Sequence, residues 1–171
     1  MNNYLLFFEK IKIIYDKYQS YEDINDFNIF SVMFKEHDEV NLHSKFLYEM
    51  LTNTNLSKEF LRLFLKILDF KYFEEEFVVI KEYKNIDLVL KNKEKVIIIE
   101  NKIYAYDQEE QLFKYYNKII SENYKKENIF IYYLTLDGRE PSLNSIQNLV
   151  IGKDIRCISY KEEILEWIKH C

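Results

Sequence analysis

Two short apolar stretches have the β-branched composition of buried strands, yet both carry ionisable side chains. The first is Ile86-Asp-Leu-Val-Leu90, which contains Asp87. The second is Val96-Ile-Ile-Ile99, which is followed at once by Glu100 and Lys102. An unpaired charge buried in a strand costs several kcal/mol. We therefore expect these groups to gather where the strands end, in a cleft that solvent reaches.

Composition is that of an ordinary globular protein, with 48% hydrophobic and 31% charged residues among 171, so we expect one domain over residues 1–171. No apolar stretch is long enough to span a membrane. The N-terminus lacks the features of a secretory signal, and two cysteines do not form a disulfide framework, which favours a cytoplasmic protein. The abundance of Lys, Ile, Asn and Tyr is typical of AT-rich coding sequence and indicates a bacterium or a mobile element.

The formal net charge of −5 excludes a strongly basic protein, so any contact with nucleic acid must come from a local patch. Lys58, Arg62 and Lys66 recur at a spacing of four on a predicted helix. This stripe could follow a phosphate backbone, although a solvated helix face is the default interpretation. Tyr104 and Tyr106, just after Lys102, could stack on a base or simply pack.

Hydrophobic periodicity predicts a helical first part, a group of strands, and a closing strand and helix. Ser57 and Asp107 are candidate N-caps, the latter with Glu110 at the third helical position. We predict a mainly helical part over 1–70, a core over 77–135 and a closing unit over 155–171, which together make an α/β fold with a mixed central sheet flanked by helices. Helices are expected over 4–18, 39–52, 57–70, 107–121 and 160–170, strands over 77–80, 86–90, 96–99, 129–134 and 155–158, and connections over 81–85 and 91–94.

Alternation along a strand places Glu100 and Lys102 on one face of the sheet. If the two strands pair as a hairpin, Asp87 lies beside Glu100. Two carboxylates and a backbone carbonyl suit Mg²⁺, which keeps several waters and activates one of them. Lys102 could orient or deprotonate that water. The simpler alternative is a structural ion pair between Lys102 and either acid.

Asp87, followed by Glu100-Asn101-Lys102, resembles the D…(D/E)-x-K signature of the PD-(D/E)XK nuclease superfamily. The resemblance implies that Asp87 and Glu100 bind Mg²⁺ or Mn²⁺ and that Lys102 is the catalytic lysine. Gln111 and Tyr115 resemble the Q-x-x-x-Y helix motif of several branches, where these residues arrange the site or contact the substrate. Tyr115 could instead be a core residue.

Glu39-Val-Asn-Leu-His43-Ser44 resembles the E-x-x-x-H-S helix of one uncharacterised bacterial branch, in which the phrases Ile-Glu-Asn-Lys-Ile-Tyr-Ala and Ile-Ser-Tyr-Lys-Glu also recur. Glu39 and His43 are four residues apart and could face the site, since carboxylate and imidazole both bind metals; a helix-surface pair is the alternative. The resemblance implies a restriction-endonuclease-like α-β-β-β-α-β core with extra N-terminal helices.

The function expected from this resemblance is that of a Mg²⁺- or Mn²⁺-dependent deoxyribonuclease, in phage defence or a mobile element. RNA is not excluded as the substrate, and a homodimer is left open. The alternative is a nuclease-fold module with weak or no catalysis that binds nucleic acid or a protein partner.

Overall fold

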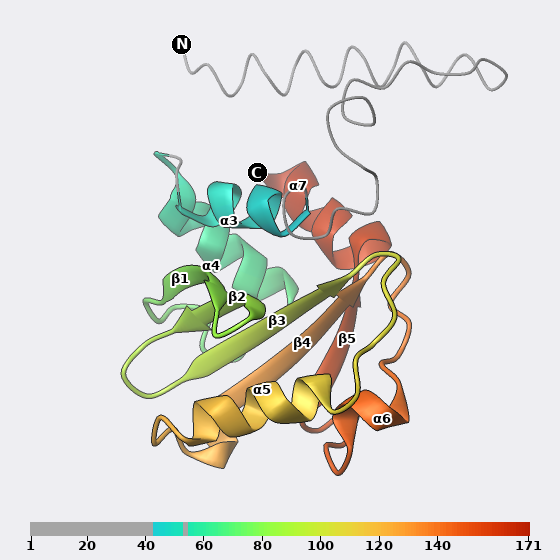
Figure 1. The fold of residues 1–171 in the computed structure, drawn as a ribbon. Coiled ribbons are helices and arrows are strands. Elements are labelled where there is room, and N and C mark those ends of the chain that lie inside the picture. The colour runs from blue at the N-terminus through green and yellow to red at the C-terminus, as the bar shows by residue number, and fades with distance from the viewer. Residues whose placement is uncertain (1–42, 53–54) are drawn as a thin grey trace, which may run out of the picture. The chain divides into compact units, whose positions relative to one another are not determined.

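The structure, a computed structural model, describes residues 43–52 and 55–171, which lie within a compact unit from Glu36 to Cys171. A five-stranded sheet forms its centre, with α5 across one face and α4 against the other (Figure 1). The elements are α3 (Lys45–Thr52), α4 (Ser57–Ile67), β1 (Val78–Tyr83), β2 (Ile86–Lys91), β3 (Val96–Lys102), α5 (Gln111–Ile120), η2 (Lys126–Asn128), β4 (Ile129–Thr135), α6 (Leu143–Ile146), β5 (Ile155–Ser159), η3 (Tyr160–Ile164) and α7 (Leu165–His170).

The sheet is mixed, and its strands follow the order β1-β2-β3-β4-β5. Strands β1, β2 and β3 are antiparallel neighbours, while β3, β4 and β5 run parallel to one another. Helix α5 makes the crossover that a parallel β3–β4 pair requires. The predicted α/β class with a mixed sheet flanked by helices is confirmed, and the order α-β-β-β-α-β runs from α4 to β4. The helix predicted over 4–18 lies outside the described residues.

Strands β1 and β2 are joined more tightly than predicted. Strand β1 continues to Tyr83, which pairs with Ile86, so the predicted connection over residues 81–85 is wrong. Only Lys84 and Asn85 separate the strands, with φ of 53° and 67°. Positive φ at both positions is the geometry of a two-residue hairpin turn whose twist matches the flanking strands.

The predicted N-caps are also wrong. Helix α5 begins at Gln111, after Glu110 in a left-handed conformation with φ 57°. Asp107 instead accepts hydrogen bonds from the Tyr133 hydroxyl at 2.7 Å and the Ser142 backbone N–H at 2.6 Å. At α4, Leu56 occupies the cap position and Ser57 is the first helical residue. Long-range partners thus determine where α5 begins.

The closing segment combines a π-helical turn, η3, with α7. Ser159 caps the turn by accepting from the Glu162 N–H at 3.0 Å, and Glu163 accepts from the Ser159 N–H at 2.7 Å. The short helix α6 was not predicted. No helix within 43–52 or 55–171 combines the length and the apolar character needed to cross a membrane.

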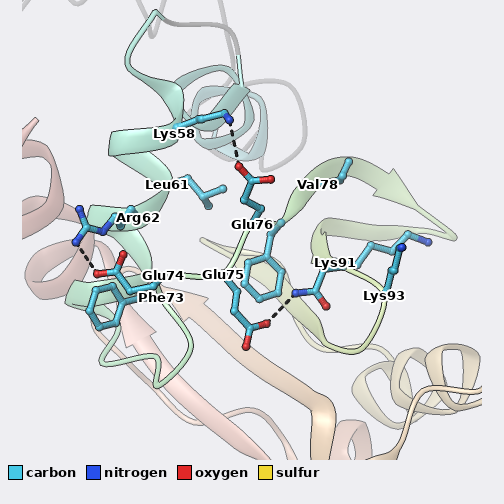
Figure 2. A pocket seen from close by; sticks show the side chains of 12 residues that line it. Lys58, Leu61, Arg62, Phe73, Glu74, Glu75, Glu76, Val78, Lys91 and Lys93 are labelled. Atoms are coloured by element: carbon cyan, nitrogen blue, oxygen red, sulfur yellow. Dashed lines mark hydrogen bonds and ion pairs between the residues drawn. The ribbon is translucent and has the colours of Figure 1, made fainter.

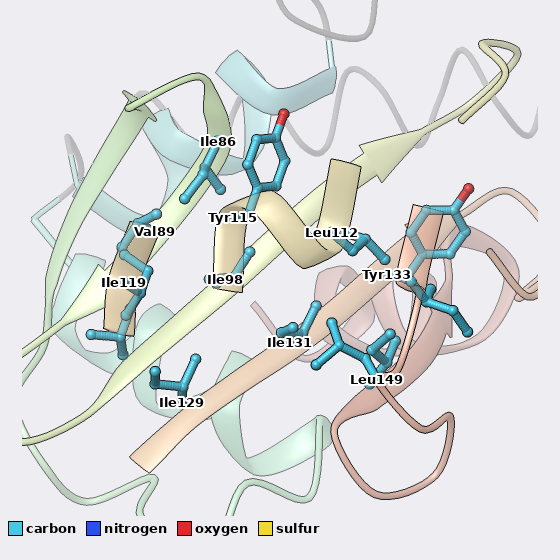
Figure 3. Close-up of a cluster of buried hydrophobic side chains, with 13 residues drawn as sticks. Ile86, Val89, Ile98, Leu112, Tyr115, Ile119, Ile129, Ile131, Tyr133 and Leu149 are labelled. Carbon is cyan, nitrogen blue, oxygen red and sulfur yellow. The ribbon is translucent and has the colours of Figure 1, made fainter. Parts of the chain in front are cut away.

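One core layer lies between α5 and the sheet (Figure 3). Ile98 of β3, Leu112 and Ile119 of α5 and Ile131 of β4 meet there, and all four are almost completely buried. On the other face, the fully buried Trp167 donates its Nε1–H to the Phe60 carbonyl at 2.9 Å. This bond ties α7 to α4.

The core position of Ile98 can be tested by truncation. We expect Ile98→Ala to lower the free energy of unfolding by about 3 kcal/mol, because it removes buried methyl groups and leaves a cavity. Val78→Ala, on a side chain that is 64% exposed, should change it by less than about 0.5 kcal/mol. Urea unfolding followed by circular dichroism measures both variants, and equal losses would contradict this description of the core.

Candidate active site

The antiparallel register of β2 and β3 determines where Asp87 lies. Leu88 pairs with Ile99, so the next step of the register sets Asp87 opposite Glu100. The Asp87 carboxylate accepts a hydrogen bond from the Asn101 backbone N–H at 2.9 Å. This bond holds the half-buried carboxylate against the end of β3.

Glu100 and Lys102 lie on one face of β3, and Lys102 Nζ is 3.1 Å from Glu100 Oε1. Their side chains are only 2% and 8% exposed respectively. The expectation that solvent reaches Lys102 is therefore wrong in this structure. Strand β3 continues to Lys102, which pairs with Thr135 of β4.

Helix α5 brings Gln111 and Tyr115 to the same carboxylate. Gln111 Nε2 donates to Glu100 Oε1 at 2.8 Å and lies 3.1 Å from the Tyr115 hydroxyl. Positions four apart on a helix face the same way, and here both face β3. The amide therefore bridges the phenol and the acid.

The charges of both carboxylates affect the pKa of Tyr115. Burial, followed by the charge of Glu100, raises the pKa of Tyr115 to about 12. The hydrogen bond from Gln111 opposes this rise in pKa, and the charge of Asp87 adds to it. Asp87 and Glu100 thus act on one phenol, as expected of acids on one side of the sheet.

Ser44, in the segment before α3, contacts β3. Ser44 Oγ accepts from the Asn101 amide at 3.2 Å, on the face of the strand opposite Glu100 and Lys102. The His43 ring packs edge-on against Tyr160, with centroids 5.6 Å apart. Glu39 lies outside the described residues.

The Asn101–Ser44 contact and the Asp107–Tyr133 contact were not predicted from the sequence. Each joins residues far apart in the chain, 57 and 26 positions respectively, and no local spacing signals such a pair. Burial and the neighbouring Asp107 raise the pKa of Tyr133.

The basic stripe on α4 is largely neutralised by glutamates. Lys58 is 3.2 Å from Glu76, and Arg62 pairs with Glu74; Figure 2 shows both pairs beside a cavity of about 520 Å³ between α4 and β1. None of the acidic or basic groups at the end of β3 lines this cavity. The pairing favours a structural explanation of the stripe.

The carboxylate oxygens of Asp87 and Glu100, near the end of β3, are of the ligand type that a hard divalent cation prefers. Across residues 43–52 and 55–171, no three or more His, Cys, Asp or Glu side chains form a group that could hold a metal. Mg²⁺, however, is commonly held through one or two carboxylates and several waters. Asp87 and Glu100 would supply those carboxylates.

A mixed sheet with two acids and a lysine at one edge of adjacent strands is consistent with a nuclease. The model of the PD-(D/E)XK nuclease superfamily matches residues 27–171, and the chain belongs to this superfamily, with its restriction-endonuclease-like fold. Divalent metals are typical of such nucleases. Searches among curated proteins and solved structures gave no match.

The pKa of Tyr115 offers a test of where the two acids lie. We expect ionisation near pH 12, and a lower pKa, still above 10, in Glu100→Gln and to a smaller extent in Asp87→Asn, because burial remains. Because the pKa of Tyr115 is raised in the folded protein, the neutral phenol contributes to the free energy of unfolding. This contribution is present below pH 10 and is lost as the pH rises through 12.

The measurement is an NMR titration of ring-labelled tyrosine, with the Tyr115 signal assigned through Tyr115→Phe. Asp154→Asn is the matched control, because Asp154 acts on Tyr116 instead. If neither carboxylate substitution changes the pKa of Tyr115, the two acids do not lie near this phenol.

Proposed function

We propose that the chain is a divalent-metal-dependent nuclease that hydrolyses phosphodiester bonds of DNA. The observation that carries this proposal is the chain of contacts from Lys102 through Glu100 and Gln111 to Tyr115, beside a carboxylate held on the same strand end. These are the acids and the lysine that the superfamily signature uses. A role in phage defence or a mobile element is proposed on composition.

Asp87 and Glu100 are the residues that would hold Mg²⁺ or Mn²⁺. When bound, such an ion lowers the pKa of a water ligand and withdraws charge from the phosphate. Glu100 is oriented for this role by Gln111, which donates to one of its oxygens. The Asn101 N–H orients Asp87 in the same way.

Besides the metal ion, Lys102 supplies a positive charge from the protein itself. Its ammonium is 3.1 Å from Glu100, so it would lie beside a water or phosphate oxygen near that carboxylate. From there it orients the attacking water and offsets negative charge that develops on the phosphate. Burial strengthens this interaction, because little water screens it.

Gln111 and Tyr115 are positioning residues in this proposal. With its pKa raised to about 12, Tyr115 stays a neutral hydrogen-bonding group across the physiological range. It fixes the Gln111 amide, which in turn fixes Glu100. Glu39 and His43 are proposed to support the site from the segment before α3.

The rival function is a nuclease-fold module that binds its partner without cutting. Burial of the Glu100–Lys102 pair favours it, because a closed ion pair is a structural unit and leaves less room for water. Such a module does not need a metal bound by Asp87 and Glu100. Metal binding and hydrolysis therefore distinguish the two functions.

Lys102→Met keeps the aliphatic stem and removes the charge. We expect it to lower the rate of plasmid and linear DNA hydrolysis in Mg²⁺ or Mn²⁺ by about 100-fold or more, the usual cost of losing one preorganised charged group. Lys169→Met, on an exposed side chain of α7, should retain the rate. A wild-type rate from folded Lys102→Met, with folding checked by thermal unfolding, would remove the assigned role.

Calorimetric titration with Mn²⁺ tests the carboxylates without DNA. We expect the wild-type protein to bind Mn²⁺ and both Asp87→Asn and Glu100→Gln to lose most of this affinity. Glu75→Gln removes a carboxylate that pairs with Lys95 at 2.8 Å and should bind as the wild type does. If Asp87→Asn and Glu100→Gln both keep the wild-type affinity for Mn²⁺, the metal binds elsewhere in the protein.

A further inference from the structure

A second cavity, lined by polar side chains, has no role in the chemistry above. It measures about 600 Å³ and lies between the loop that follows β3 and the loop that follows β4. Tyr106 and Glu109 line it from the first loop, and Arg139, Glu140 and Asn144 line it from the second loop and α6. The volume is sufficient for one nucleoside.

The cavity lies at the same edge of the sheet as Lys102. Strands β3 and β4 are parallel, and Lys102 pairs with Thr135 at their carboxyl ends. Both loops leave the sheet from these two neighbouring positions. A nucleic-acid strand that placed a phosphate at Lys102 would therefore pass the cavity with an adjacent nucleotide.

Hydrogen bonds between the two loops shape the cavity. Arg139 donates to the Ala105 carbonyl at 3.1 Å, and the Glu110 N–H donates to the Asn144 carbonyl at 2.8 Å. Asp107 accepts from Tyr133 below it and from Ser142 across from it. Tyr106 lies between these anchored positions, and its side chain is almost fully open to solvent, at 89% exposure.

The chemistry of the lining suits a base better than a phosphate. The carboxylates of Asp107, Glu109 and Glu140 outnumber the guanidinium of Arg139 in the lining and repel a phosphate group. The oxygens of Glu109 and Glu140 accept hydrogen bonds from exocyclic amino groups of bases. The Tyr106 ring offers a stacking surface, which only a base released from its pair can use. A paired base presents neither its face nor its pairing edge to such a cavity.

We propose that this cavity is a subsite for one unpaired base next to the scissile phosphate, with Tyr106 as the stacking platform and Glu109 and Glu140 as acceptors for an exocyclic amine. The inference rests on the proposed nuclease function and specifies its substrate as single-stranded or locally opened nucleic acid. Cytosine is favoured over thymine, because thymine lacks the amine.

The test is fluorescence anisotropy with labelled single-stranded oligo(dC), oligo(dT) and a duplex, in EDTA so that nothing is cut. Wild-type protein should bind oligo(dC) more tightly than oligo(dT). Tyr106→Ala should weaken single-strand binding about tenfold, the cost of one lost base stack, and leave duplex binding unchanged. Tyr106→Phe should bind as the wild type does, and the Glu109→Ala/Glu140→Ala variant, which lacks both acceptors, should lose the preference for oligo(dC).

Equal weakening of single-strand and duplex binding by Tyr106→Ala, or no weakening at all, would overturn the subsite. Equal wild-type affinity for oligo(dC) and oligo(dT) would overturn the role given to the two glutamates. The proposed nuclease function fails on a different result, namely no metal-dependent hydrolysis by the wild type. The two failures are distinguishable, because anisotropy in EDTA does not depend on cleavage.

Discussion

The register between β2 and β3 is the constraint on which the rest of the site depends. Pairing of Leu88 with Ile99 sets Asp87 opposite Glu100, and a slip by one residue would turn every side chain of β2 to the other face. The β1–β2 pair is fixed by the turn at Lys84 and Asn85. The bond from the Asn101 N–H to the Asp87 carboxylate then holds the start of β2 on β3, so strand register and one side-chain hydrogen bond together place the two acids.

Burial of Glu100 and Lys102 is costly to folding, and this cost is informative. Two charges removed from water lose solvation that their mutual attraction only partly restores, so a buried ion pair is weak evidence for stability. Here Gln111 supplies a further hydrogen bond to Glu100, and Tyr115 completes the polar chain. Stability alone therefore does not explain this set of polar groups in an otherwise apolar layer, and the two proposed functions differ in whether Glu100 and Asp87 bind a metal.

The sequence was informative wherever the physics is local. β-branched runs identified the strands, and the alternation of side chains along a strand correctly predicted that Glu100 and Lys102 share one face. Prediction failed where a distant partner decides the outcome. Asp107 has the residue type and spacing of an N-cap, but Tyr133 and Ser142 take its carboxylate. The burial of Lys102 was missed for the same reason, because the neighbouring β4 comes from a later part of the chain.

Charge distribution explains why the proposed recognition would use bases rather than the phosphate backbone. The formal net charge is −5, and glutamates neutralise Lys58 and Arg62 on α4. Affinity for a phosphate backbone grows with the counterions that basic side chains release, and here 29 Asp and Glu outnumber 24 Lys and Arg. A stacking surface at Tyr106 gains affinity without net positive charge. A cation, if held by Asp87 and Glu100 as proposed, would then provide the local positive charge that a scissile phosphate needs.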